Sequence, residues 1–393
     1  MPFKIELENL PAGYSMSAVK GGGKVEVAVS GFYSSEDGDE FIQKLEGFPN
    51  EIISKLPMSL GIRPSTVDHL IVIIDRDKTA TVYVNEITFL SKVQVTRSVA
   101  EGEPVRLDDI ADIHSIIPKG VEIPKSSGLL ILISVGWRKG LFFDFFPLQF
   151  KNAKDRDFDI HIFLGQIYSY LLFQNRFKIS EMQWNEILKQ GWFPFISLGS
   201  SLVNDIINYA KNSWNIDDLI NKIKSFFDEK IDNLEAKWCS IKMLESHSPF
   251  IQKAISHYKA QDYLSSISVL YPRIEGIMRD YHLIIGSSEK ATQSQLVETI
   301  VKAKDPDSRP YSLLLPDKFR EFLSNVYFAN FDPQGKKPLS RHSVSHGVAD
   351  VEDYSLKGSI VGFLCLDQLS FYLSGHTKVD KANSADTKSH AAD

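Results

Sequence analysis

Alternating apolar and polar positions mark the first part of the chain. In the stretch GKVEVAVSGFY, Val25, Val27 and Val29 fall on one side of an extended segment, and further apolar runs occupy 69–77, 79–90, 128–137 and 141–148. Polar residues at 75–78 and RKG at 138–140 separate neighbouring runs, as tight hairpins require. Because no long helical pattern intervenes, we predict a β-rich sensing or regulatory domain over 1–150, built as a sandwich, a barrel or a curled sheet.

The spacing of apolar residues becomes helical from about residue 151. Apolar side chains recur every three or four positions from Ile162 to Leu172, and similar patterns follow at 180–190, 198–213, 216–245, 248–259, 260–284, 317–328 and 354–373. Pro272 lies inside one of them, where we expect a kink or a helix boundary. The patterns predict a helical connecting region over 151–248, a compact helical domain over 249–376 and a disordered tail over 377–393. The fold class is therefore predicted to be α+β.

Composition narrows the classes of function. The formal net charge of −6 disfavours a protein that holds long duplexes through a coat of Lys and Arg, although it allows a local basic pocket for short or single-stranded RNA. Two cysteines cannot form a disulfide framework or a Cys-rich zinc site. The apolar stretch 359–373 contains Asp367 and is shorter than the roughly 20 residues of a membrane span. We expect a cytoplasmic protein without a membrane partner.

The stretch PLSRHSVSHGVAD, residues 338–350, is the strongest candidate for a functional site, because it places one arginine and two histidines within six positions. Ser340 can cap a helix that begins at Arg341, and Gly347 can end it in a left-handed conformation. His342 and His346 then lie one turn apart on one face. Arg341 and His346 diverge by roughly 140° on an ideal helix. An Arg–His pair that acts on one phosphate therefore needs an irregular helix start or a second copy of the motif.

Three interpretations of this stretch remain open. It can be a helix end with solvated polar residues. It can be a metal site made of His342, His346 and Asp350, although a HExxH pattern is absent. It can also serve phosphodiester chemistry, because an arginine holds a phosphate and a histidine with a pKa near neutrality moves a proton.

Arg, four residues and then His, placed late in a helical domain, resembles the HEPN superfamily, with His342 at its variable polar position. The RHxxxHG form and the upstream segment LYPRIEGIMRDY, residues 270–281, are similar to the C-terminal domains of abortive-infection-like ribonuclease families. The resemblance covers roughly residues 250–375.

The resemblance implies a metal-independent endoribonuclease that needs no cofactor and acts in phage defence or a toxin-like stress response. Arg341 would neutralise the phosphate, and His346 would be the general acid or base. His342 would form hydrogen bonds that position the reacting groups. Two chains would build one cleft, which predicts a homodimer through the C-terminal helical domain. The alternative is a non-catalytic module that binds RNA, a nucleotide or a protein, since many members of this superfamily are catalytically silent.

Three further residues carry weaker expectations. Lys336 and Lys337 precede the motif and can attract RNA, or they can belong to an ordinary solvated loop. Glu275 can orient Arg341 or His346 across the bundle, although an intrabundle salt bridge or a solvated position is the more common role of such a residue.

Overall fold

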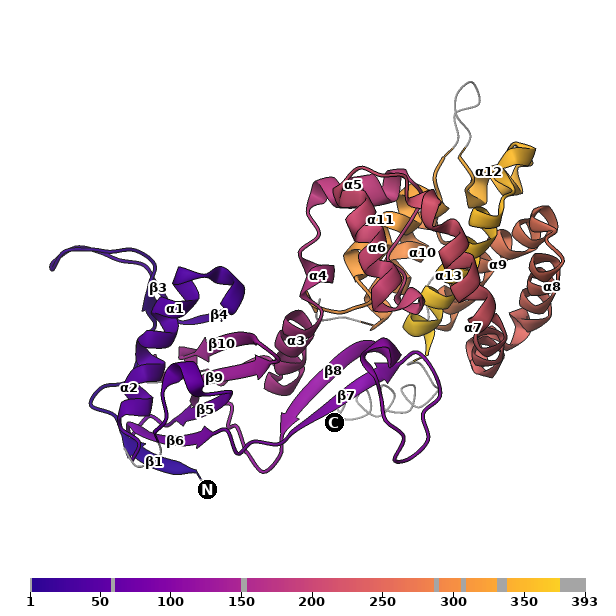
Figure 1. Ribbon diagram of the computed structural model, residues 1–393. Helices are drawn as coiled ribbons and strands as arrows, with labels where there is room; N and C mark the ends of the chain where they lie inside the picture. The colour runs from indigo at the N-terminus through magenta and orange to yellow at the C-terminus, as the bar shows by residue number, and fades with distance from the viewer. Residues whose placement is uncertain are drawn as a thin grey trace, which may run out of the picture. The chain divides into compact units, whose positions relative to one another are not determined.

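The computed structural model describes residues 2–57, 61–149, 154–285, 290–304, 309–330 and 338–374 (Figure 1). The chain divides into two compact units, one made of residues 1–93 and 113–174 and the other of residues 94–112 and 175–393. An antiparallel sheet forms the centre of the first unit, and helices form most of the second. The fold class is α+β, as the sequence predicts. The predicted disordered tail at 377–393 lies outside the described residues.

The first unit contains a six-stranded sheet in the order β1-β6-β5-β9-β10-β4. Every neighbouring pair in it is antiparallel. Its strands are β1 (Phe3–Glu6), β4 (Ser30–Ser34), β5 (His69–Ile74), β6 (Thr79–Val84), β9 (Gly128–Val135) and β10 (Arg138–Asp144). Two short strands, β2 (Tyr14–Ser15) and β3 (Val27–Ala28), pair separately. This sheet is open, with β1 and β4 at its edges, so of the three architectures expected the sandwich and the barrel are excluded, and a single sheet is found.

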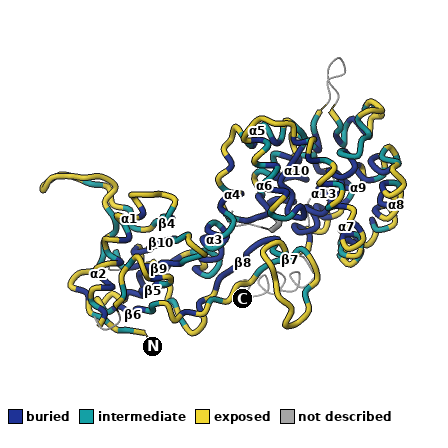
Figure 2. Tube along the Cα trace, in the orientation of Figure 1, coloured by how far each residue is buried: buried dark blue, intermediate teal, exposed yellow. Residues whose placement is uncertain are grey.

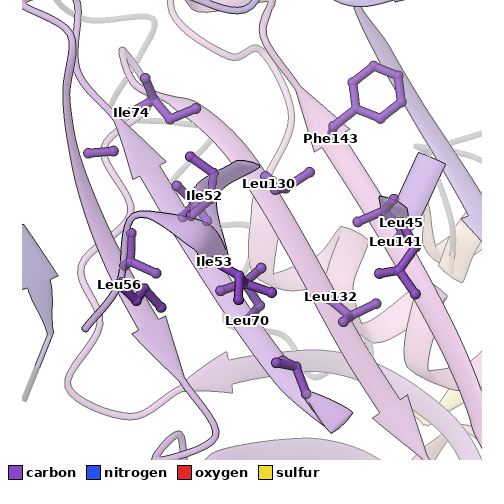
Figure 3. Packing of buried hydrophobic residues seen from close by; sticks show 14 of the residues in the cluster. Leu45, Ile52, Ile53, Leu56, Leu70, Ile74, Leu130, Leu132, Leu141 and Phe143 are labelled. Carbon is purple, nitrogen blue, oxygen red and sulfur yellow. The ribbon is translucent and has the colours of Figure 1, made fainter. Parts of the chain in front are cut away.

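Helices cover both faces of the sheet, which explains why its central strands are apolar throughout. On one face, α1 (Asp39–Glu46) and α2 (Phe48–Ser54) pack against the strands. Figure 3 shows Ile52 and Ile53 of α2 beside Leu130 and Leu70, and Leu45 of α1 beside Leu141. On the other face, α3 (Ile160–Leu172) packs through Phe163, whose ring centroid lies 4.6 Å from that of Phe142. The sequence patterns predicted the central strands but neither α1 nor α2.

The division of the chain differs from the predicted boundary at residue 150 in two places. Helix α3 stays with the sheet, because it packs on β10 and Arg138 Nη1 donates a hydrogen bond to Leu171 O at 2.9 Å. The segment 94–112 joins the helical unit, where Ser200 N donates to Asp108 Oδ1 at 3.0 Å. The change of unit falls within a two-stranded ribbon of β7 (Phe89–Val95) and β8 (Ile110–Pro118).

The second unit is helical (Figure 1). Its helices are α4 (Gln174–Phe177, which begins one residue before the unit), α5 (Glu181–Lys189), α6 (Gly199–Lys211), α7 (Ile220–Ser240), α8 (Ser248–Lys259), α9 (Tyr263–Ile284), α10 (Gln293–Lys304), α11 (Pro316–Phe322), α12 (Arg341–Ser345) and α13 (Leu356–Leu373). Helix α9 continues through Pro272, so of the kink or boundary expected there the boundary is excluded. A π-helical turn, Leu323–Tyr327, follows α11 directly.

Helix α13 is the core of this unit. All its residues from Gly358 to Leu373 are buried, whereas α7 and α8 alternate between buried and exposed positions (Figure 2). The buried carboxylate of Asp367 accepts hydrogen bonds from Lys237 Nζ at 2.5 Å and Trp238 Nε1 at 2.8 Å. The charge that interrupts this apolar stretch therefore has partners inside the bundle. Among the described residues, no helix combines the length and apolar character that crossing a membrane demands.

Candidate functional site

The helix α12 begins with a reciprocal cap. Ser340 Oγ accepts a hydrogen bond from Ser343 N at 3.2 Å, and Ser343 Oγ accepts one from Ser340 N at 2.9 Å. Such a capping box satisfies amide donors that the first turn of a helix leaves without partners. Ser340 is thus the N-cap that the sequence predicts, and Arg341 is the first residue of the helix.

The helix ends after little more than one turn. Gly347 adopts φ +66°, a left-handed conformation that suits glycine. Gly347 N donates to Val344 O at 3.2 Å and Val348 N donates to Ser343 O at 3.0 Å, the two bonds of a Schellman motif. Because His346 is the C-cap, it stands where the chain leaves the helix. The predicted end of the helix at Gly347 is confirmed.

Buried contacts fix α12 on the bundle. Ser343 and Val344 are buried, whereas Arg341 is partly exposed and His346 is exposed. Ser340 Oγ donates to Ala329 O at 2.8 Å, which ties the helix start to the chain after the π-helical turn. Leu339 packs on Gly358 of α13, where an added Cβ would lie 2.4 Å from Leu339 Cδ2. Arg341, at the start of α12, and His346, at its C-cap, both lie outside the apolar core, as predicted.

A buried carboxylate on α9 connects two guanidinium groups. Glu275 Oε1 accepts hydrogen bonds from Arg279 Nε at 2.8 Å and Nη2 at 2.6 Å, and Glu275 Oε2 forms an ion pair with Arg341 Nε. The side chain of Arg341 is 23% exposed and that of Arg279 is 42% exposed. One buried negative charge faces two partly exposed positive ones, so the cluster carries a net positive charge toward solvent. Glu275 thus forms an intrabundle salt bridge, the more common of the roles considered for it, and Arg341 is one of its two partners.

His342 is held by hydrogen bonding and ring packing. Its Nε2 lies 2.8 Å from Gln293 Oε1, and its ring centroid lies 6.5 Å from that of Phe328. Burial lowers the pKa of His342, and the charges of Arg341 and His346 lower it further. A neutral His342 that donates through Nε2 fits this environment.

His346 is the exposed histidine of the pair. Its ring lies nearly parallel to that of His342, with centroids 6.1 Å apart and planes at 7°. The prediction that the two histidines share one face is therefore confirmed. Arg341 instead extends to Glu275 on α9, so the helix directs the guanidinium and the exposed imidazole to different neighbours.

The metal interpretation lacks a set of ligands. Within the described ranges, no group of three His, Cys, Asp or Glu side chains is placed to hold a metal ion, so His342, His346 and Asp350 do not form one. Lys336 and Lys337 lie outside the described residues. Gln293 and Phe328 could not be predicted as neighbours of His342, because both reach it only through the packing of segments distant in sequence.

We expect the substitution Glu275→Gln to lower the free energy of unfolding by about 1–3 kcal/mol. The amide keeps the shape of the side chain but leaves Arg279 and Arg341 without their shared carboxylate. The loss stays below that of a fully buried pair because both arginines reach solvent. Urea unfolding followed by circular dichroism measures it, with Glu229→Gln on the exposed side of α7 as the matched control. Equal stabilities of the two variants would contradict the anchoring role.

Comparison with known proteins adds no assignment to this geometry: no family model matches the chain, and neither a curated protein nor a solved structure is significantly similar to it.

Proposed function

We propose that the protein is a metal-independent endoribonuclease of the HEPN type, with Arg341 and His346 as its catalytic residues. The observation that carries the proposal is the presentation of these two side chains at the surface of the helical unit, on a short helix that both ends fix in place. Preorganised charge and a positioned proton carrier are the requirements of phosphodiester cleavage.

In the proposed reaction the RNA supplies its own nucleophile. The 2′-oxygen attacks the adjacent phosphorus, the bond to the 5′-oxygen breaks, and the products are a 2′,3′-cyclic phosphate and a 5′-hydroxyl. The proton of the 2′-hydroxyl is removed and the leaving 5′-oxygen receives one. His346 performs one of these two transfers as general base or general acid.

Arg341 stabilises the charge that develops on the phosphate. The ion pair with Glu275 engages Nε, and the four remaining N–H donors of a guanidinium sit on its two Nη atoms. The fork of an arginine matches the geometry of two phosphate oxygens. Glu275 and Arg279 thus act as positioning residues. His342, with its lowered pKa, positions RNA by hydrogen bonding rather than by charge.

Two copies of the chain complete the proposed site. Arg341 extends toward α9 while His346 stands at the other end of α12, so one copy of the helix directs them apart. A two-fold interface places the same patch on both subunits and brings Arg341 of one chain toward His346 of the other. The proposed partners are therefore RNA and a second copy of this chain, in a reducing, cytoplasmic setting.

One observation favours a second function. An arginine bonded to a buried glutamate is also what a purely structural anchor of α12 requires. In that case the helical unit binds RNA, a nucleotide or a protein without cleaving RNA, and the exposed His346 has no catalytic role.

Cleavage in the presence of EDTA tests the proposed chemistry. Because the RNA provides the nucleophile and Arg341 provides the charge, the purified protein should cleave a fluorescent single-stranded RNA at an unchanged rate in excess EDTA. The matched 2′-deoxy oligonucleotide should remain intact. Loss of cleavage on chelation, with recovery on addition of zinc or manganese, would contradict the mechanism.

A further inference from the structure

A second cationic site lies away from α12 in the helical unit. A cavity of about 400 Å³, open to solvent on one side, is lined by the segment from Arg176 to Trp184, the end of α10, the chain from Arg309 to Tyr311, and α11. This volume lies in the range of small-molecule sites. None of the residues of the α12 motif lines it.

The lining of the cavity is positively charged although the chain as a whole carries −6. It contains five cationic side chains: Arg176, Lys302, Arg309, Lys318 and Arg320. Its two carboxylates already have partners, since Glu181 pairs with Lys318 at 2.9 Å and Asp317 pairs with Arg320 at 2.5 Å. Lys302 and Arg309 pair with carboxylates outside the lining, Glu298 and Asp112, both at 3.4 Å. Arg176 pairs with neither carboxylate of the lining, so the cavity favours an anion beside it.

Arg176 is the observation that points to a ligand. Only 5% of this residue is exposed, and its Nη1 is buried without a hydrogen-bond partner in the described structure. Burial lowers the pKa of Arg176 to about 10, and the charge of Asp108 opposes this shift. A buried cation whose donors lack partners is costly, and an anion in the cavity removes that cost.

Arg309 supplies a second guanidinium that is held in place. Its side chain is 9% exposed, and its Nη2 lies 3.4 Å from Asp112 Oδ2. Asp112 also accepts hydrogen bonds from Ser312 Oγ and Leu313 N, both at 3.0 Å. The buried carboxylate therefore fixes the chain that carries Arg309, and a preorganised cation binds an anion at a lower entropic cost.

Aromatic side chains add an apolar wall. Tyr311 and Phe177 line the cavity and contact each other edge to face, with ring centroids 5.4 Å apart. Trp184 lines it as well. A cationic pocket with aromatic walls suits a small ligand that combines phosphate with an apolar or aromatic part.

We propose that this cavity binds a small phosphorylated ligand, whose phosphate oxygens accept hydrogen bonds from Arg176 and Arg309. Guanidinium groups bind phosphate through paired N–H donors. The site is separate from the proposed ribonuclease chemistry, and its test measures binding alone, so either proposal can fail without the other.

The test uses pyrophosphate as the probe, with sodium chloride at the same ionic strength as the reference. We expect pyrophosphate to raise the melting temperature of the full chain by several degrees, because a ligand that binds only the folded state stabilises it. Titration calorimetry should show at least about tenfold weaker binding to Arg176→Gln. The melting temperature of Arg176→Gln without ligand should equal or exceed that of the wild type, because a buried unpaired charge is removed.

Two further variants make the result decisive. Arg320→Gln alters a side chain that is 40% exposed, so the variant should fold. It removes one positive charge from the lining that attracts the anion, so it should bind pyrophosphate several-fold more weakly. Arg106→Gln removes an exposed arginine of the same unit outside the cavity and should bind like the wild type. Binding of ATP at least tenfold tighter than pyrophosphate would identify a nucleotide, and equal binding would identify the phosphate alone as the recognised group.

Two results would overturn the proposal. One is an equal shift in melting temperature with pyrophosphate and with sodium chloride. The other is wild-type affinity for pyrophosphate in Arg176→Gln, or in Arg320→Gln if Arg176→Gln does not fold.

Discussion

Cleavage of single-stranded RNA should fall at least about 100-fold in His346→Ala, because a general acid or base typically contributes a factor of 10² to 10⁴ to the rate. The side chain is exposed at the C-cap of α12, so its removal leaves no buried cavity and should not change the free energy of unfolding. Initial rates on a fluorescent RNA, with 2′,3′-cyclic phosphate products identified by mass spectrometry, measure the effect.

Two matched variants separate catalysis from structure. His346→Asn retains hydrogen bonding but cannot carry a proton near neutral pH, so it should be as inactive as His346→Ala. His257→Ala removes a histidine on α8 of the same unit, which pairs with Asp262 at 3.0 Å, and should cleave like the wild type. Full activity of His346→Ala would exclude the proposed role. A wild-type protein that binds RNA and leaves it intact would favour the non-catalytic module.

The fold was predictable where the pattern of apolar residues within one segment is enough to identify a strand or a helix. The apolar runs at the centre of the sheet are continuous because helices cover both of its faces, and they predicted β5, β9 and β10. Helices α1 and α2 are short and separated only by Gly47, and Pro49 follows at the start of α2. Neither is therefore long enough to show a clear helical repeat of apolar residues. The sequence therefore left a sandwich and a barrel open beside a single sheet, because the helices that cover one of its faces were not predicted.

The local geometry of the site was also predictable, and its partners were not. The cap at Ser340 and the left-handed Gly347 follow from residue types at fixed offsets from the helix ends. The hydrogen bond between His342 and Gln293 and the pairing of Arg341 with Glu275 depend on how α9, α10 and α12 pack. Contacts between helices distant in sequence have no signature in a single chain, and the sequence allowed several partners for Glu275.

The pairing of Arg341 with Glu275 is the structural reason for proposing a site shared between two subunits. Glu275 on α9 holds the guanidinium of Arg341 away from His346 at the end of α12. If both residues act on one phosphate, we therefore expect them to come from different chains. In the proposed two-fold dimer there would be two sites, each with Arg341 of one subunit and His346 of the other.

Mixing inactive variants tests this arrangement. Pure Arg341→Ala and pure His346→Ala should each retain about 1% or less of the wild-type rate. In a mixed dimer, one site contains both alanines and the other contains an intact Arg341 and an intact His346. Random exchange of equal amounts makes about half of the dimers mixed, and each mixed dimer of this two-fold assembly has one intact site of its two. About a quarter of all sites are then intact, so we expect recovery to about a quarter of the wild-type rate.

The control mixes two preparations of His346→Ala with different affinity tags, which should stay inactive because no site then contains a histidine. Tandem purification through both tags confirms that mixed dimers form. If purified mixed dimers remain as inactive as the pure variants, the site is not shared between subunits. A monomer that cleaves RNA at the full rate at every concentration would exclude the composite site more directly, and Arg341 and His346 would then have to meet within one chain by a movement of α12 away from Glu275.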